Sequence, residues 1–322
     1  METRFLKWRS HCRRATPPRL TEDFVPADRE RALEALMETT TQSVKLGDIE
    51  AFVARVGAGK PLVVCGGPQL GHRYMRRLDV LADEHELIYY DARGSGQTEL
   101  GEASELTFAR AVADLERLRA GLGIERFSIL GHSLGGHVAY LYASRYPERV
   151  EALLLVDVGP PFAQDQATEL SQSMTSSRTP EDDARLEEIQ GSDAFGRREP
   201  KAVEDFILNI YAPFFRDRRS IETFDLGFTA ITAANVLDYE ERLVASLADE
   251  DPVARLAMVR CPTLVVHGEL DPIPVAFGRL LADSIPGAEF ALLPGAKHFP
   301  FLENQDQFQR TVRTFLSTRS TV

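Results

Sequence analysis

Short apolar runs alternate with longer amphipathic stretches along most of the chain, starting at about Val44. The short runs predict strands at 49–56, 61–65, 86–90, 127–130, 152–156, 263–267 and 289–293. The stretches between them predict helices at 73–84, 107–121, 135–146, 275–284 and 305–317. The alternation therefore predicts an α/β fold, in which helices cover both faces of a mostly parallel sheet.

One long segment interrupts this alternation between two predicted strands. We interpret 160–250 as a helical cap, inserted into a core that is formed by 44–159 and 251–322. Apolar side chains recur at helical spacing within the cap, at Val203, Phe206, Ile207, Ile210 and Phe214. This stripe predicts a helix face that forms the core of the cap or, in part, covers a substrate pocket.

The start of the chain differs from the rest in charge. Residues 1–20 contain six Lys or Arg and one Glu, whereas the whole chain has a net charge of -12. We interpret 1–43 as a basic N-terminal extension with a short helix at 27–37. The extension lacks the apolar stretch of a secretory signal, and no run is long enough to span a bilayer, so we expect a cytoplasmic protein without membrane contacts. The overall negative charge also disfavours nucleic acid as a partner.

The three cysteines, Cys12, Cys65 and Cys261, are too few and too scattered for a disulfide framework or a zinc site. Reduced thiols are therefore expected. Cys65 lies beside a glycine-rich loop, where it is either a reactive thiol or a buried cysteine that acts as a small apolar residue.

The strongest chemical signal is the segment Gly131-His132-Ser133-Leu134-Gly135-Gly136, between a predicted strand and a predicted helix. A serine in this strand-turn-helix context is typical of a nucleophile elbow, in which small neighbours let strand and helix approach closely. Ser133 is therefore the predicted nucleophile.

A serine hydroxyl needs a general base and an acid that orients the base. His298, just after the last predicted strand, is the predicted base, while His132 is held beside the elbow and points away from the hydroxyl. Asp271, after the strand at 263–267, is the predicted acid, with Asp157 and Glu269 as alternatives. The remaining histidines are expected at the surface: His11, His72, His85, His137 and His267.

Acyl transfer also requires N–H donors for the developing oxyanion. Leu134, directly after the nucleophile, is expected to supply one. The second is expected from the loop Cys65-Gly66-Gly67-Pro68-Gln69, in which Pro68 has no N–H and Gly67 is the better donor.

The Gly66-Gly67-Pro68 loop, the turn at 91–96, the elbow, Asp271 and His298 together resemble the α/β-hydrolase superfamily over nearly all of the chain after Val44. The resemblance implies an α/β-hydrolase fold, with an eight-stranded, mostly parallel sheet and a cap after the sixth strand. The loop most resembles that of proline iminopeptidases, H-G-G-P-G, although Cys65 replaces the His and Gln69 the last Gly. His132 and Leu134 make the elbow similar to that of esterases and lactonases. The resemblance also implies that Asp91 and Arg93 hold their loop and perform no chemistry.

These residues predict a serine hydrolase for a small-molecule substrate, an ester, a lactone or an N-terminal aminoacyl amide. The mechanism requires no cofactor or metal, and the oligomeric state stays open. A serine in place of aspartate disfavours dehalogenase and epoxide hydrolase chemistry. Alternatives are a carbon-carbon bond hydrolase or lyase and a noncatalytic ligand receptor on the same scaffold.

Aminopeptidase activity would require a partner for the substrate ammonium. The cap contains 19 Asp or Glu and 9 Lys or Arg. The acids that flank its apolar stretches are the candidates for substrate binding: Glu204, Asp238, Glu240 and Glu241.

Overall fold

The computed structural model describes residues 38–160 and 164–318, so the helix expected at 27–37 lies outside the described residues. Its centre is an eight-stranded sheet in the order β1-β2-β4-β3-β5-β6-β7-β8. Six neighbouring strands pair in parallel: β3 (Lys60–Cys65), β4 (His85–Tyr90), β5 (Phe127–His132), β6 (Val150–Val156), β7 (Thr263–Gly268) and β8 (Glu289–Leu293). At one edge, β2 (Glu50–Val56) pairs antiparallel both with β4 and with β1 (Thr40–Lys45).

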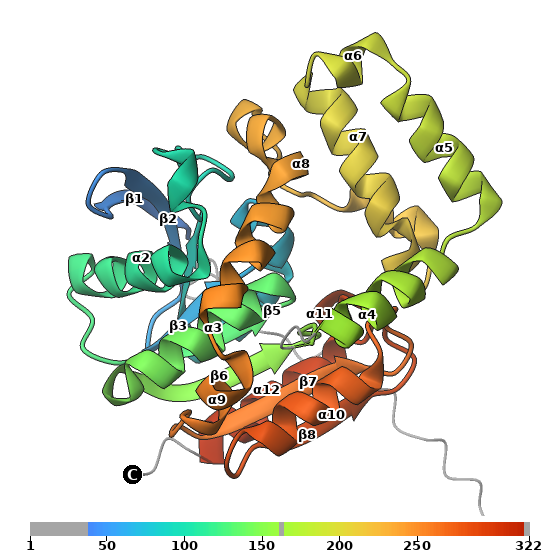
Figure 1. Cartoon of the computed structure of the whole chain (residues 1–322). Helices are drawn as coiled ribbons and strands as arrows, with labels where there is room; N and C mark the ends of the chain where they lie inside the picture. The colour runs from blue at the N-terminus through green and yellow to red at the C-terminus, as the bar shows by residue number, and fades with distance from the viewer. Residues whose placement is uncertain (1–37, 161–163, 319–322) are drawn as a thin grey trace, which may run out of the picture.

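Helices pack on both faces of this sheet, as the sequence predicts (Figure 1). One face carries α2 (Phe108–Gly121), α3 (Leu134–Arg145), α9 (Pro252–Ala257) and α10 (Val275–Ser284). The other face carries the 3₁₀ helix η1 (His72–Leu81), α11 (Pro300–Glu303) and α12 (Gln305–Thr318). Short 3₁₀ segments at η2 (Ala103–Glu105) and η3 (Pro147–Arg149) lie in the connections. Two apolar cores therefore enclose the strands.

The cap lies between β6 and β7. It contains α4 (Gln164–Ser176), α5 (Pro180–Gln190), α6 (Asp193–Gly196), α7 (Pro200–Tyr211), η4 (Ala212–Phe214), η5 (Arg218–Thr223), α8 (Ala230–Ala245) and η6 (Ser246–Asp249). In Figure 1, α5, α6 and α7 project away from the sheet, and α8 runs back toward α3. Of the predicted apolar stripe, Val203 and Ile207 are buried in the cap's core, whereas Phe214 reaches the site described below.

Two elements differ from the sequence-based expectation. Strand β1 begins at Thr40, inside the segment 1–43 that we assigned to the N-terminal extension. It was missed because only Val44 of its six residues is buried, so an edge strand leaves no apolar run. The α-helix expected at 73–84 is the 3₁₀ helix η1, which nevertheless buries Tyr74, Met75 and Leu78.

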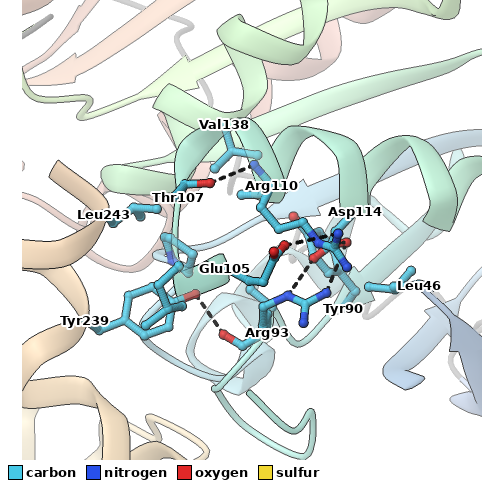
Figure 2. Close-up of a pocket in the computed structure, with 14 residues that line it drawn as sticks. Leu46, Tyr90, Arg93, Glu105, Thr107, Arg110, Asp114, Val138, Tyr239 and Leu243 are labelled. Carbon is cyan, nitrogen blue, oxygen red and sulfur yellow. Dashed lines mark hydrogen bonds and ion pairs between the residues drawn. The ribbon is translucent and has the colours of Figure 1, made fainter. Parts of the chain in front are cut away.

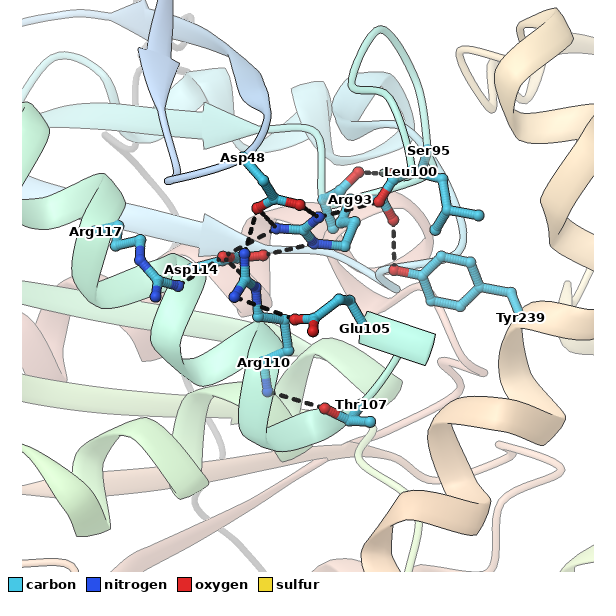
Figure 3. Close-up of polar contacts among 11 residues, drawn as sticks. Asp48, Arg93, Ser95, Leu100, Glu105, Thr107, Arg110, Asp114, Arg117 and Tyr239 are labelled. Carbon is cyan, nitrogen blue, oxygen red and sulfur yellow. Dashed lines mark hydrogen bonds and ion pairs between the residues drawn. The ribbon is translucent and has the colours of Figure 1, made fainter. Parts of the chain in front are cut away.

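Arg93 holds the loop after β4, in agreement with its expected structural role. Its guanidinium donates to Asp48 (Nη1···Oδ2, 2.9 Å) and to Asp114 (Nε···Oδ2, 3.0 Å), as Figure 3 shows. The backbone carbonyl of Arg93 also accepts from the Tyr239 hydroxyl of α8 at 2.9 Å. Asp91 in turn accepts from the N–H groups of His72 and Gln97, both at 2.8 Å. The bond from Tyr239 thereby joins the loop after β4 to the cap.

A small cavity borders this network between α2, α3 and α8 (Figure 2). Its volume is about 20 Å³, which is room for about one water molecule. Among the described residues, no helix is both long enough and apolar enough to cross a membrane.

Candidate functional site

Ser133 stands at a sharp turn between β5 and α3, with φ 53° and ψ −127°. A positive φ is costly for a residue with a side chain, and it occurs mostly where the surrounding structure enforces it. Here the Ser133 N–H donates to the Val156 carbonyl (3.0 Å), and its own carbonyl accepts from the Gly136 N–H (2.9 Å). These contacts hold the turn and present the side chain at the carboxyl edge of the sheet.

The glycines of the elbow are required by close packing. A Cβ at Gly131 would lie 2.7 Å from the Cα of Gly136, across the turn. A Cβ at Gly135 would overlap the carbonyl oxygens of Cys65 and Gly66. The small residues therefore let α3 start directly against β5 and the loop after β3, as the motif predicts.

The catalytic base and acid predicted from the sequence meet in the structure. His298 lies on the loop between β8 and α11, and its Nδ1 lies 2.9 Å from Asp271 Oδ2 on the loop after β7. Asp271 Oδ1 accepts from the Ile273 N–H at 2.9 Å. Burial opposes ionisation of Asp271, but the adjacent His298 outweighs it and lowers the pKa of this carboxyl. Asp271 is thus an acceptor for the Nδ1–H of His298, which leaves Nε2 of His298 free of a proton.

The two alternative acids point elsewhere. Asp157, at the end of β6, accepts from the Gly268 N–H at 2.7 Å. Burial, followed by the charge of Asp271, raises the pKa of Asp157 well above its usual range, which disfavours the charged form of this carboxyl. Glu269 is exposed and accepts from the Gly295 N–H at 2.9 Å. Asp271 is therefore better placed as the acid than either alternative.

His132 connects the two catalytic loops without reaching the cavity. Its Nε2 donates to the His298 carbonyl (2.8 Å), and its Nδ1 accepts from the Tyr74 hydroxyl (3.1 Å). Burial and the nearby His298 lower the pKa of His132 to about 3, which keeps the ring neutral. The Tyr74 hydroxyl also accepts from the Gly67 N–H at 2.6 Å. The donor expected from Gly67 is therefore already paired, and it would serve an oxyanion only if Tyr74 released it.

Ser133, Leu134 and His298 line one cavity between the sheet and the cap. Its volume is about 50 Å³, which is room for only a few water molecules, so a larger substrate requires the cap to shift. The other residues of its wall are Gln69, His137, Gly159, Leu170, Met174, Tyr211, Phe214, Glu240 and Ile273. Most of this wall is apolar, and α4, α7, η4 and α8 of the cap contribute to it. No sequence pattern predicts that Gln69, Leu170, Met174 and Tyr211 line the cavity, because their position depends on how the cap packs on the core.

Of the four cap acids proposed for substrate binding, Glu240 alone lines this cavity. Its side chain is exposed at the rim of the cavity, and desolvation by the surrounding protein raises the pKa of its carboxyl. Glu204 pairs with Lys201 (3.4 Å) and Asp238 with Arg198 (3.0 Å). Glu241 is exposed and lies outside the cavity wall. The structure thus does not bring Glu204, Asp238 or Glu241 to the site.

The expectation that the remaining histidines lie at the surface is wrong for the four that the structure describes, since all are buried: His72, His85, His137 and His267. All four are polar side chains inside the core. His137 Nε2, for example, donates to the Pro160 carbonyl (3.0 Å), and burial lowers the pKa of His137 to about 4. Cys65 is also buried, which raises the pKa of its thiol to about 12 and favours its role as a small apolar residue.

One group of side chains has the composition of a metal site. Potential ligand atoms of Asp157, His267 and Asp271 lie within 4.8 Å of one another. Each side chain already has a protein partner, since His267 Nε2 donates to the Ile273 carbonyl (2.9 Å) and Asp271 bonds His298. These contacts join the group to the end of β7 and the loop that follows it.

Comparison with known proteins finds an esterase and proline iminopeptidases among the similar proteins. A pimeloyl-[acyl-carrier protein] methyl ester esterase of Chromobacterium violaceum is 29% identical over 273 residues, which cover 84% of this chain and 99% of the relative. A proline iminopeptidase of Lactiplantibacillus plantarum is 25% identical, with 80% and 92% covered. The crystal structure of a proline iminopeptidase of Mycobacterium smegmatis superposes with a TM-score of 0.64 at 23% identity, over 87% of this chain and 98% of that one. The chain is thus similar both to an esterase and to proline iminopeptidases, the two classes of enzyme whose motifs it resembles.

The match to a family covers most of the sequence. Residues 60–305 correspond to the family described as alpha/beta hydrolase fold. This segment includes the elbow, the acid loop and the histidine loop. The chain therefore belongs to the α/β-hydrolase fold family.

Proposed function

We propose that this α/β-family hydrolase cleaves a small acyl substrate, an ester, a lactone or an N-terminal aminoacyl amide, through an acyl-enzyme on Ser133. One observation carries the proposal: Ser133 opens into the same cavity as His298, whose Nδ1 is held by Asp271 at 2.9 Å. A histidine fixed in this way presents Nε2 to accept the serine proton. The relatives named above include an esterase and a peptidase, which fits this range of acyl substrates.

In the proposed mechanism, the Oγ of Ser133 attacks the acyl carbon while its proton moves to Nε2 of His298. The acyl oxygen becomes an oxyanion, which the N–H of Leu134 stabilises. This N–H belongs to the first residue of α3, where a helix leaves its N–H groups without helical partners. Return of the proton expels the leaving group, and water then releases the acyl group by the same steps. The Gly67 N–H stays the predicted second donor, on the condition that its hydrogen bond to the Tyr74 hydroxyl breaks.

A fluorophosphonate probe tests the nucleophile directly, because it reacts with activated serines whatever their acyl specificity. We expect one label per chain, lost in Ser133→Ala and kept in Ser43→Ala, a matched change on the exposed strand β1. Labelling that survives Ser133→Ala would contradict the proposal. A parallel screen of p-nitrophenyl esters, lactones and aminoacyl naphthylamides identifies the acyl class, and the small cavity favours acetyl over long-chain esters.

Glu240 favours a second, narrower candidate, an aminopeptidase. A carboxylate in the cavity with Ser133 could pair with the ammonium of an N-terminal residue. Only the ionised form of Glu240 does this, and its pKa is raised, so preference for the free amine should grow as the pH rises through that pKa.

The test compares an aminoacyl naphthylamide with its N-acetylated form. Glu240→Gln should abolish preference for the free amine, whereas Glu241→Gln, its exposed neighbour, should keep it. Equal turnover of both compounds by the unchanged protein would remove the peptidase candidate and leave the esterase or lactonase. Turnover of a diketone but not of esters would instead favour a carbon-carbon bond hydrolase, and tight binding without turnover a receptor.

A further inference from the structure

The oxyanion would be left with one donor if Leu134 acted alone. The Gly67 N–H expected to help donates to the Tyr74 hydroxyl at 2.6 Å, and Tyr74 is buried outside the cavity wall. A second donor must therefore come from a group that faces the cavity.

The side chain of Gln69 lines the same cavity as Ser133 and Leu134 and carries N–H donors. The Leu70 N–H donates to the Gly67 carbonyl (2.9 Å), which closes a turn with Pro68 and Gln69 at its centre. From this turn, the Gln69 amide folds back over Gly67. A Cβ at Gly67 would lie 3.0 Å from Gln69 Oε1 and 3.4 Å from Nε2, so the glycine makes room for the amide.

Gln69 is only 5% exposed, yet its amide is incompletely paired. Nε2 donates one hydrogen to the Tyr211 hydroxyl of α7 at 3.3 Å, and Oε1 is buried without a hydrogen-bond partner among the described residues. The second hydrogen of Nε2 is uncommitted. Buried polar groups are normally paired in folded proteins, so a spare N–H in the wall of the cavity that Ser133 also lines is available to an acceptor that arrives with substrate.

The other polar side chains of the cavity are less suited to bind an oxyanion. Glu240 is an acceptor and would repel it. His137 already donates to the Pro160 carbonyl, and His298 is the base. Tyr211 has a hydroxyl proton of its own, and it is therefore the one competitor that an experiment must separate from Gln69.

We propose that the side-chain amide of Gln69 is the second oxyanion donor, acting with the Leu134 N–H in place of Gly67. This proposal rests on Ser133 being the nucleophile. As the bond between Oγ and the acyl carbon forms, the carbonyl electron pair moves to oxygen, where Nε2–H of Gln69 and N–H of Leu134 hold it. Tyr211 accepts the other Nε2 hydrogen and so orients the amide, which makes Tyr211 a positioning residue supplied by the cap.

The test measures the rate of fluorophosphonate labelling of the full chain, because the phosphoryl oxygen takes the place of the acyl oxygen. Gln69→Met has a similar size and no donor, and it should slow labelling about 100-fold, the usual effect of removing one oxyanion donor. Gln69→Glu keeps Oε1 and the shape but also lacks the N–H, so it should be slowed at least as much. Gln42→Met on the exposed strand β1 is the matched control and should label at the original rate.

Tyr211→Phe separates the competitor and should slow labelling less than 10-fold, because the amide keeps its donor. Labelling of Gln69→Met or of Gln69→Glu at nearly the original rate would overturn the proposal. Slow labelling of Tyr211→Phe alone, with normal rates in both Gln69 variants, would also overturn it. No labelling of the unchanged protein would instead refute Ser133 as the nucleophile. A trifluoromethyl ketone, which forms an oxyanion on the serine, provides a second measurement: its Kd should rise in Gln69→Met by the factor by which labelling slows. An unchanged Kd would count against Gln69.

Discussion

Carboxylate oxygens of Asp157 and Asp271 lie within 4.8 Å of each other, and the structure predicts different consequences when each aspartate is changed to asparagine. Asp271 Oδ2 accepts from Nδ1–H of His298, while its Oδ1 accepts from the Ile273 N–H, both at 2.9 Å. An asparagine that keeps the bond to Ile273 must turn its NH₂ group toward His298. Two donors would then face each other, so His298 would move its proton to Nε2, where it blocks proton transfer from Ser133.

The expected loss follows from this tautomer. Asp271→Asn should lower kcat by about 10³- to 10⁴-fold, or roughly 4 to 5.5 kcal/mol of transition-state stabilisation. Asp157→Asn should lower kcat less than about 10-fold, because burial already disfavours the charged form of this carboxyl and an amide oxygen can still accept from Gly268. The Tm of each variant should stay close to that of the unchanged protein, since neither change alters the shape of the side chain.

Steady-state kinetics on the best ester from the screen, with thermal unfolding of the same preparations, measures both effects. The pair of variants is its own control, because the chemical change is identical and only the position differs. A crippled Asp157→Asn beside a nearly normal Asp271→Asn would refute the assignment of the acid. Equal, mild effects would show that His298 keeps its tautomer without either carboxylate.

Three further changes test how the site is supported. Gly135→Ala should destabilise the fold or prevent expression, because the added Cβ overlaps two backbone carbonyl oxygens; a normal Tm would contradict the close packing. His137→Gln should reduce the acid sensitivity of folding: the unfolded histidine takes up a proton near pH 6.5 and the folded one only near 4, so stability falls as the pH drops between them. At pH 4.5 this share is on the order of 2 to 3 kcal/mol, and urea unfolding at pH 7 and 4.5 should show a correspondingly smaller loss of stability in the variant. Arg93→Met should lower the unfolding free energy by about 2 to 4 kcal/mol, since it removes the buried partner of Asp114. Asp48 is exposed, so an equally large loss of unfolding free energy in Asp48→Asn would contradict this reasoning.

The sequence determined the features that depend on short-range order. The strand-turn-helix pattern and its glycines predict the elbow at Ser133, because the strained turn is built from consecutive residues. The positions of Asp271 and His298 just after two predicted strands predict that they meet, since the carboxyl ends of parallel strands lie at one edge. The α/β class and the inserted cap also follow from the order of apolar runs.

Only the tertiary structure decided which groups near the site are paired and which are free. Glu240 and Glu241 are adjacent in sequence and both are exposed, but α8 places only Glu240 in the wall of the cavity that Ser133 lines. The Gly67 N–H was expected to be free, and its partner Tyr74 comes from η1, whose packing no local pattern reveals. Gln69 likewise acquires its place from Tyr211, 142 positions away in the chain. Hydrogen bonds between distant segments depend on how the helices pack on the sheet. Hydrophobic periodicity predicts the helices and strands themselves but not these hydrogen bonds.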